Sequence, residues 1–154
     1  MERQRLWVLV SIGVLASCAA DSARVAVERS SEREQHRLAA EVFVQHASAG
    51  NVSELLTLMA NVTLQANEPG ALEAYLRDQV APFFQGYSRL HWQGQFLPVQ
   101  DEQGNKGAQY YEFVEASDGE VHPFVITLFP EAGDHRVTSI VVGECFWGYH
   151  LKCP

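Results

Sequence analysis

The chain has 154 residues, of which 47% are hydrophobic and 19% are charged, so it is long enough for one domain with its own core and is not of the disordered class. Its formal net charge of −8 argues against nonspecific binding to nucleic acid, which needs a basic surface. The same charge is repelled by anionic lipid, so association with a membrane requires a separate anchoring device.

The first 17 residues have the pattern of an export signal peptide. Arg3 and Arg5 precede an apolar run of 11 residues (6–16), which is too short to span a bilayer but typical of signal peptides. The run ends in Leu-Ala-Ser-Cys, which resembles the lipobox of bacterial lipoproteins. The resemblance implies that Cys18 becomes the first residue of the mature chain and is acylated, which anchors the protein stably.

The alternative to lipidation is an ordinary secretory peptide that is cut near Ala19 or Ala20. In the lipoprotein family, an Asp directly after the acylated cysteine favours retention in the inner membrane. Ala19 stands there, which implies the outer membrane, with the protein facing the periplasm. Residues 18–29 are mostly small and polar and are expected to form a tether, so the folded domain is expected to span residues 30–154.

The first helix is predicted from Ser30, because serine caps helix N-termini and the acidic residues that follow suit the first turn. We expect it to run to Ala49 and to end at Gly50. Residues at helical spacing predict the side of this helix that faces the core, which comprises Leu38, Ala39, Val42, Phe43, His46 and Ala47.

Two more helices and a short strand are predicted before residue 87. Asn51 or Ser53 is expected to cap a short second helix. Residues 62–65 alternate like a strand, and residues 71–84 have the apolar spacing of a third helix. Pro82 is expected to disturb the last turn of this third helix, because proline has no backbone N–H.

The region from Tyr87 to Gly143 predicts four long strands joined by short turns, because each candidate strand is rich in β-branched and aromatic residues and each break contains Gly, Asn or Asp. The candidate strands are residues 89–100, 108–116, 120–129 and 135–144. Turns this short favour antiparallel neighbours. We therefore predict an α+β fold, with three N-terminal helices packed on a curved, mainly antiparallel sheet of four long strands plus a short one.

This order of elements resembles the nuclear transport factor 2-like superfamily, the cone-shaped α+β fold shared with ketosteroid isomerase. The resemblance is carried by the block from Phe43 to Met59, with its Ala-Gly-Asn break, and by the meander from Tyr87 to Gly143. It implies a sheet that curls around the long helix, often with a pocket inside the cone. Members include isomerases, hydrolases, ligand binders and secretion-system components, so fold alone does not imply an activity. Cystatin-like domains share the helix-then-sheet order and stay open as an alternative.

If the domain is an enzyme, its catalytic groups must come from the strands, whose titratable candidates are His91, Tyr110, Tyr111, Glu112, Glu115 and His122. In ketosteroid isomerase an Asp base works with a Tyr and a protonated acid, a set that cannot be matched here residue by residue. Strand alternation separates Glu112 from Glu115. His122 is the best candidate for an inward group, with Glu112 or Glu115 across the hairpin; the alternative is a solvated His122 at the rim.

The last residues combine two cysteines with aromatic and imidazole side chains. With Cys18 acylated, Cys145 and Cys153 are expected to form a disulfide in an oxidising compartment; the alternative is a metal site that they form with His150. The side chains between them predict either a partner-binding patch or a tail folded over an open end of the sheet, and they comprise Phe146, Trp147, Tyr149 and His150.

The sequence contains no HExxH, Gly-rich phosphate loop, GxSxG or paired CxxC motif, so we predict no cofactor and no metal. It favours a lipid-anchored, noncatalytic periplasmic binding module. The expected partner is an envelope or secretion component, a toxin that the protein inhibits, or a small apolar ligand, and not nucleic acid. The alternative function is an isomerase- or hydrolase-type enzyme that uses an acid–base pair in the cone pocket.

Overall fold

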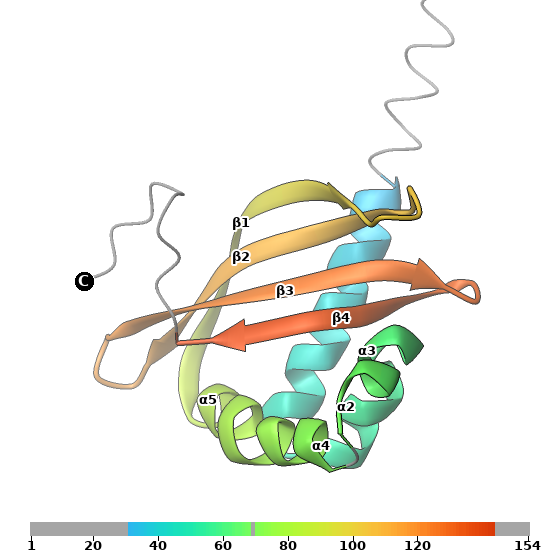
Figure 1. The fold of residues 1–154 in the computed structure, drawn as a ribbon. Helices are drawn as coiled ribbons and strands as arrows, with labels where there is room; N and C mark the ends of the chain where they lie inside the picture. Colours follow the sequence, from blue (N-terminus) through green and yellow to red (C-terminus); the bar gives the residue numbers. More distant parts are fainter. Residues whose placement is uncertain (1–30, 69, 144–154) are drawn as a thin grey trace, which may run out of the picture. The chain divides into compact units, whose positions relative to one another are not determined.

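The computed structural model describes residues 31–68 and 70–143, apart from the side chains of residues 93–95. Contacts within the chain divide it into two units, Met1–Gln35 and His36–Pro154. Of the first unit, residues 31–35 are described, and they are helical. The described part of the second unit has helices on one face of an antiparallel sheet (Figure 1), which confirms the α+β class.

The helix that is described from residue 31 ends at residue 48. Gly50, with a φ of +71°, adopts the left-handed conformation that terminates many helices. Its N–H donates to the carbonyl of Ala47 at 3.0 Å, and the N–H of Asn51 donates to that of His46 at 3.0 Å. These two bonds satisfy carbonyls of the last turn, so the predicted stop at Gly50 is confirmed.

The buried side of this helix differs from the predicted one. Leu38 and Val42, which were expected to face the core, are 48% and 41% exposed. Within the second unit, the buried residues lie three or four positions apart along one side of the helix, and they are His36, Ala40, Phe43, Val44 and Ala47. The small side chains at positions 40 and 47 allow close packing on either side of Phe43.

Two short helices follow, α2 (Val52–Leu58) and α3 (Asn61–Ala66). Asn51 occupies the N-cap position of α2 but makes no side-chain capping bond. The strand predicted at residues 62–65 is wrong, because these residues belong to α3. With residues 71–84 counted as one continuous helix, the described residues therefore form four helices, not the predicted three.

The run from residue 71 to 84 comprises α4 (Ala71–Tyr75), the π-helical turn η1 (Leu76–Val80) and α5 (Ala81–Phe84). Pro82 lies in the first turn of α5, where it cannot donate the usual hydrogen bond to the turn before it. A widened turn directly before the proline is the local response to this missing donor. Leu76, Val80 and Phe84 nevertheless stay buried, so the run still presents one apolar side.

The predicted meander is confirmed. Its strands are β1 (Tyr87–Gln100), β2 (Lys106–Ala116), β3 (Val121–Glu131) and β4 (Asp134–Val142), in the order β1-β2-β3-β4 with every neighbouring pair antiparallel. The registers shift twice in the β1–β2 ladder and once between Thr127 and Leu128 of β3, where Thr138 of β4 becomes the extra residue of a bulge.

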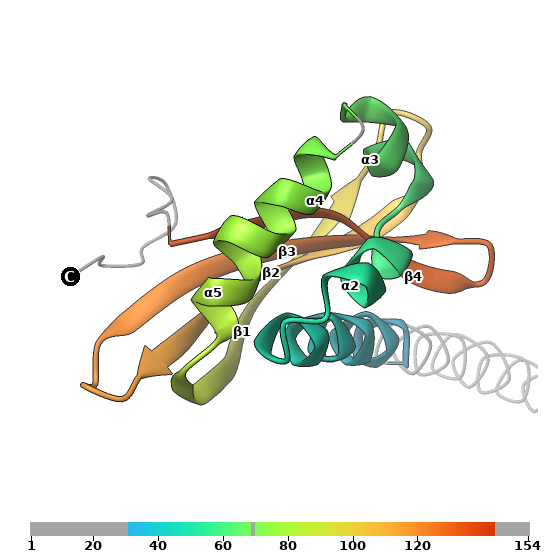
Figure 2. The same ribbon diagram turned by 90° about the horizontal axis from the view of Figure 1, so that it is seen from below.

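The sheet has two distinct faces. The inner face, covered by the helices (Figure 2), carries alternate residues such as Tyr110, Glu112 and Val114 of β2. The outer face carries the residues between them. The largest buried side chains of the core are Phe43 of the first helix, Phe84 of α5 and Phe124 of β3, and the rings of the last two meet edge to face at 5.0 Å.

The helices are joined to the edge of the sheet at β4. Met59 forms an isolated parallel bridge with Val137, and the N–H of Ala60 donates to the carbonyl of Val137 at 2.8 Å. The hydroxyl of Tyr75 donates to the carbonyl of Ile140 at 3.1 Å. The sequence predicted a short strand at residues 62–65, and the bridge at Met59 lies three residues before it. The contacts of this paragraph use carbonyls of β4 that an edge strand otherwise exposes.

Candidate functional site

The carboxylate of Glu112 lies on the inner face and is 1% exposed. Its strand neighbours on that face, Tyr110 and Val114, are also buried, and Phe124 stands directly opposite in β3. Trp92 contacts both Tyr110 and Phe124 edge to face, with ring centroids 6.2 Å apart in each pair. Glu112 is therefore held in the aromatic part of the core and has almost no contact with solvent.

His122 shares the inner face with Glu112 but lies at its rim. It pairs with Val114 in the β2–β3 ladder, which places it diagonally from Glu112. Its side chain is 44% exposed, and its Nε2 lies 3.7 Å from a carboxylate oxygen of Glu120, itself in the β2–β3 turn. The ring of Phe83 packs against its imidazole at 6.4 Å. His122 is thus solvated at the edge of the helix-covered face.

The close acid–imidazole pair of the sheet lies on the outer face. The Nε2 of His91 in β1 is 2.9 Å from a carboxylate oxygen of Glu115 in β2, and the two side chains are 20% and 32% exposed. An imidazole oriented by a carboxylate can hold or move a proton. Ser88, the hydroxyl beside this pair, donates instead to the carbonyls of Glu115 and Ala116, at 3.0 and 3.2 Å.

The two tyrosines considered with these groups are engaged on opposite faces. Tyr110 is packed inward against Trp92, whereas the hydroxyl of Tyr111 donates to the amide oxygen of Gln109 on the outer face at 2.7 Å. Gln109 in turn donates to the hydroxyl of Thr127 at 3.0 Å. The structure therefore brings together His91 and Glu115, but it does not combine the six candidates into one accessible site.

Metal binding has no arrangement to support it in the described part of the chain. No group of three or more His, Cys, Asp or Glu side chains lies close enough there to hold an ion. The imidazoles of His36 and His135 lie against each other, with ring centroids 4.1 Å apart and planes tilted by 50°.

An open groove of about 480 Å³ lies at the end of the sheet away from the β2–β3 turn, where the β1–β2 turn, the β3–β4 hairpin and the start of α3 meet. Its volume falls in the range of small-ligand sites, which hold about 300–1,000 Å³. Its lining falls into two chemical groups. The apolar or hydroxyl-bearing residues, here called the floor, are Ala60, Val62, Phe129, Pro130 and Thr138, and the charged or amide residues, here called the rim, are Asp101, Glu102, Gln103, Asn105 and Glu131.

The floor of this groove depends on two local features of the sheet. Gly107 stands opposite Phe129, and a Cβ at that position would lie 2.7 Å from the Phe129 ring and 2.5 Å from the carbonyl of Leu128. Only glycine therefore lets the ring lie against β2. The bulge in β4 places Thr138 at the floor, where its carbonyl accepts a hydrogen bond from the hydroxyl of Thr63 at 2.9 Å.

The β1–β2 turn is built around Asp101. Its carboxylate accepts hydrogen bonds from the backbone N–H groups of Gln103 and Asn105, at 2.9 and 2.8 Å, and from the side-chain amide of Asn105 at 2.8 Å. The Asn105 side-chain bond, with the backbone donors, holds the pKa of Asp101 below its ordinary value. Asp101 therefore stays ionised to a lower pH than an isolated aspartate does.

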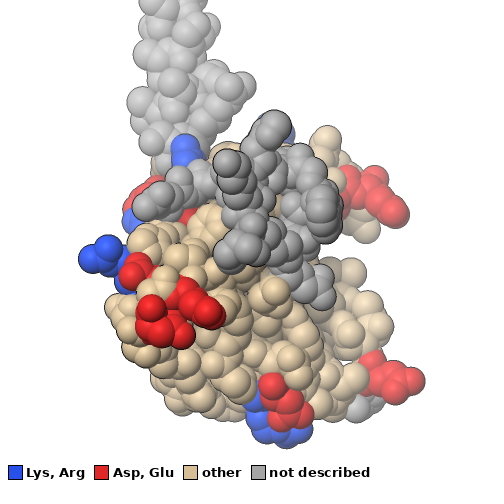
Figure 3. Space-filling model, turned by 90° about the vertical axis from the view of Figure 1, so that its left-hand side faces the viewer, with Lys and Arg blue, Asp and Glu red and all other residues tan. Residues whose placement is uncertain are grey.

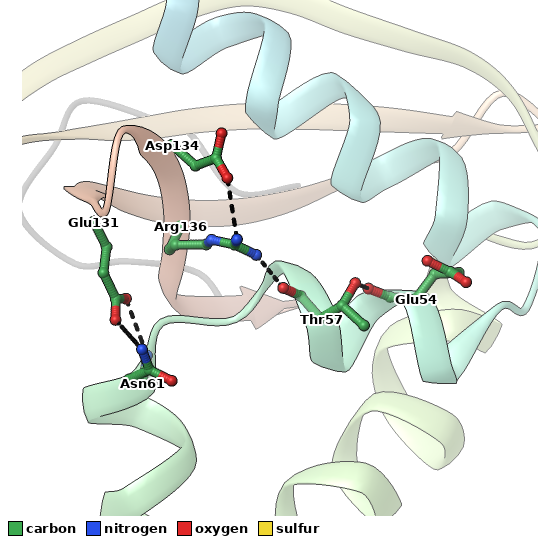
Figure 4. Close-up of polar contacts among 6 residues, drawn as sticks. All are labelled: Glu54, Thr57, Asn61, Glu131, Asp134 and Arg136. Atoms are coloured by element: carbon green, nitrogen blue, oxygen red, sulfur yellow. Dashed lines mark hydrogen bonds and ion pairs between the residues drawn. The ribbon is translucent and has the colours of Figure 1, made fainter.

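Glu131 forms the rim on the opposite side, where β3 ends. Its carboxylate accepts from the backbone N–H of Asn61 at 3.0 Å and from the Asn61 side-chain amide (Figure 4). On the same hairpin, Arg136 bridges the carboxylate of Asp134, at 3.1 Å, and the carbonyl of Thr57. These contacts fix the groove wall to both short helices.

The rim is one of several separate charged groups on the protein. On the side seen in Figure 3, the described charged side chains form small separate groups, some with acidic and basic side chains in contact, around a broad uncharged surface. The groove differs because Asp101, Glu102 and Glu131 line one depression, and among the described residues none of the three contacts a Lys or Arg. Sequence reasoning missed this site, because its rim comes from two turns that are 30 residues apart.

The predicted sites at the two ends of the chain lie outside the described residues. They are the lipidation site Cys18, the disulfide Cys145–Cys153, and the binding residues Phe146, Trp147, Tyr149 and His150.

In the part of the chain that the structure describes, no helix has the length and apolar character needed to cross a membrane. Comparison of the chain with protein-family models, with curated proteins and with solved structures finds no match in any of the three.

Proposed function

We propose that this chain is a lipid-anchored protein of the bacterial envelope whose domain is a noncatalytic binding module. The observation that supports binding is the open groove at the β1–β2 turn, which combines apolar floor residues with three carboxylates that have no cationic partner among the described residues. Folding leaves part of this apolar lining accessible, since the side chain of Val62 is 66% exposed.

The arrangement of titratable groups favours a binding module over an isomerase- or hydrolase-type enzyme. An acid–base pair in an interior pocket would need Glu112 and His122 to reach one substrate. Glu112 is 1% exposed within the aromatic core, whereas the His122 side chain is 44% exposed and lies beside Glu120. The His91–Glu115 pair lies on the other face of the sheet and adds nothing to such a site.

The proposal also includes the fold family of the domain. We assign the domain to the nuclear transport factor 2-like architecture, because a long helix, short helices and a four-stranded antiparallel meander follow one another in that order. In this architecture many members act by binding, which agrees with the proposed role. An experimental structure with the sheet flat, and not curled around the first helix, would contradict the assignment.

The lipid anchor rests on the Leu-Ala-Ser-Cys motif that ends at Cys18. Cells fed with radiolabelled palmitate should label the wild-type chain and not Cys18→Ser, which should also leave the membrane fraction. The matched control is Cys145→Ser, which keeps the lipobox and should be labelled like the wild type. Equal labelling of Cys18→Ser and the wild type would refute the anchor.

The binding role is tested by placing a photoreactive amino acid at Val62, on the groove floor, or at Val121, which is 40% exposed and outside the groove lining. In the protein's own cells, light should crosslink the Val62 variant to a defined partner. The Val121 variant should give no adduct of the same mass. Equal adducts from both positions, or none from Val62, would contradict binding in the groove.

A further inference from the structure

The groove rim carries negative charge that the described part of the protein does not neutralise. Asp101 accepts bonds from neutral amide groups, and Glu131 accepts from the amide groups of Asn61. Glu102 is exposed beside Asp101, and among the described residues it has no ion-pair partner. Because each of these bonds is made to a neutral donor, all three carboxylates keep their charge available to an incoming cation.

The floor of the groove is largely apolar, and Val62 and Pro130 on it are exposed. The side chain of Val62 is 66% exposed, and Leu64, which belongs to the same helix but lies outside the groove lining, is 39% exposed. The helix that bears them, α3, buries none of its residues. Phe129 and Pro130 continue the apolar surface on the side of β3. A ligand that fits this surface must therefore carry apolar groups as well as positive charge.

The distribution of the carboxylates selects the kind of cation. A calcium ion takes six to eight oxygen ligands at about 2.3–2.6 Å, which requires convergent side chains. The described residues contain no cluster of three potential metal ligands. Separate ammonium or guanidinium groups, each on a flexible apolar stem, fit carboxylates that are spread around a rim.

We propose that the groove binds an extended basic segment of a protein partner, in which Lys or Arg residues alternate with apolar ones. In an extended chain, alternate side chains point to opposite sides, so the apolar groups can face Val62 and Phe129 while the long stems of the basic groups on the other side bend back to the carboxylates of the rim. The groove is open to solvent, so the segment can continue beyond it. This inference rests on the proposed binding role of the groove and adds the chemistry of its occupant.

The test uses the full mature chain with Cys18→Ser and three synthetic pentapeptides with blocked ends. The first alternates Lys and Leu, the second replaces Lys by Glu, and the third replaces Leu by Ser. Fluorescence anisotropy at low salt should detect binding of the Lys–Leu peptide. The other two peptides should bind at least about tenfold more weakly, because each lacks one of the two matching features. Binding should weaken as salt is added.

Variants assign that binding to the groove. Glu102→Gln should weaken binding of the Lys–Leu peptide about twofold to fivefold, as expected for one exposed charge pair. Val62→Ser should weaken it to a similar degree by removing an apolar contact. Glu120→Gln, which removes an exposed charge from the β2–β3 turn, should leave the affinity unchanged. Both substituted groove side chains are exposed, and circular dichroism should confirm that each variant folds.

The outcomes separate this inference from the proposed function. The proposal of a basic segment would be overturned if the Lys–Leu peptide did not bind, or if Glu102→Gln and Val62→Ser did not weaken its binding. If hexylammonium bound as tightly as the Lys–Leu peptide, the occupant would be a small cationic amphiphile, and the proposal of a basic segment would also be overturned. If crosslinking from Val62 still succeeded in cells, the groove would remain a binding site with a different occupant. If crosslinking failed as well, both proposals would be wrong.

Discussion

Glu131, the last residue of β3, accepts a hydrogen bond at 3.0 Å from the backbone N–H of Asn61, the first residue of α3 (Figure 4). Ala60, at the N-cap of α3, has no side chain that can make this bond. Arg136 acts in the opposite sense, since it donates to a carbonyl at the end of α2, whose last turn has no basic residue. One hairpin thus supplies the complementary charge at the end of one helix and the start of the next.

The first prediction concerns this long-range cap. Glu131→Ala should lower the free energy of unfolding by about 0.5–1 kcal/mol, because an N–H at the start of α3 loses its acceptor. Glu131→Gln keeps an acceptor oxygen and should cost less than half as much. Urea denaturation measures both, with Glu102→Ala as the control that removes a charge from the same groove without removing a cap. Equal losses in all three variants would show a general charge effect and not a cap.

The second prediction tests the packing of helix on sheet. Phe43 and Ile126 are both 0% exposed, so alanine at either position should cost about 2–5 kcal/mol through lost burial and the cavity that remains. The matched control is Val42→Ala, on the same helix as Phe43 but 41% exposed, which should change stability by less than about 1 kcal/mol. Urea denaturation curves give the three values. Losses of less than about 1 kcal/mol at both core positions would contradict the packing.

The strands and turns could be predicted from the sequence because their signals are local. Alternation and turn residues are read within a few positions, and the observed strands agree with the expected ones to within a few residues. Helix α3 was missed for the opposite reason. Val62 and Leu64 alternate with polar residues as in a strand, while the bonds that help hold the helix come from Glu131 and from Thr138. Contacts with partners 70 or more residues away leave no local pattern.

The groove could not be predicted for a related reason. Asp101 reads as an ordinary turn residue, and Glu131 as the polar end of a strand. Their joint role depends on the register that brings the β1–β2 turn beside the β3–β4 hairpin. It depends also on the bulge that brings Thr138 into the groove lining, and a bulge is not visible in a strand's composition. The separation of Glu112 from Glu115, in contrast, follows from alternation and was predicted.

A third prediction comes from the turn of the β3–β4 hairpin. Ala132 has a φ of +53° and is followed by Gly133 at +89°, the pair of positive angles typical of a two-residue hairpin turn. Alanine is strained there, whereas Asn and Gly adopt this conformation readily. Ala132→Asn should therefore raise the free energy of unfolding by about 0.5–1 kcal/mol. Ala132→Val should lower it, and the reverse order in thermal denaturation would show that the turn is not strained.

A fourth prediction concerns the pair Cys145 and Cys153. With Cys18 acylated, these are the remaining cysteines, and we expect them to be joined in an oxidising compartment. Closing a loop of this size should stabilise the protein by about 2–3 kcal/mol in the chain-entropy model. Thiol titration of the unfolded Cys18→Ser chain, purified without reductant, should find no free thiol. Two free thiols would refute the disulfide, and the double Cys145→Ser, Cys153→Ser variant supplies the background value.

The final prediction follows the charge of Asp101. Its pKa in the folded protein is lowered, first by the Asn105 side-chain bond, so folding favours the ionised form. The stability this contributes is fully present above the pKa of the unfolded chain, at about 3.9, and is lost as the pH falls through the lower folded-state value. Asp101→Asn removes that titration, so its stability should fall less steeply than that of the wild type between about pH 4 and pH 2. Glu102→Gln, which removes the neighbouring carboxylate but not the turn bonds, is the control.

Carbon-detected NMR of the Asp101 carboxyl group should give a titration midpoint below about 3.9. A midpoint at or above that value would mean that the turn does not hold the carboxylate ionised, and parallel pH curves for wild type and Asp101→Asn would lead to the same conclusion.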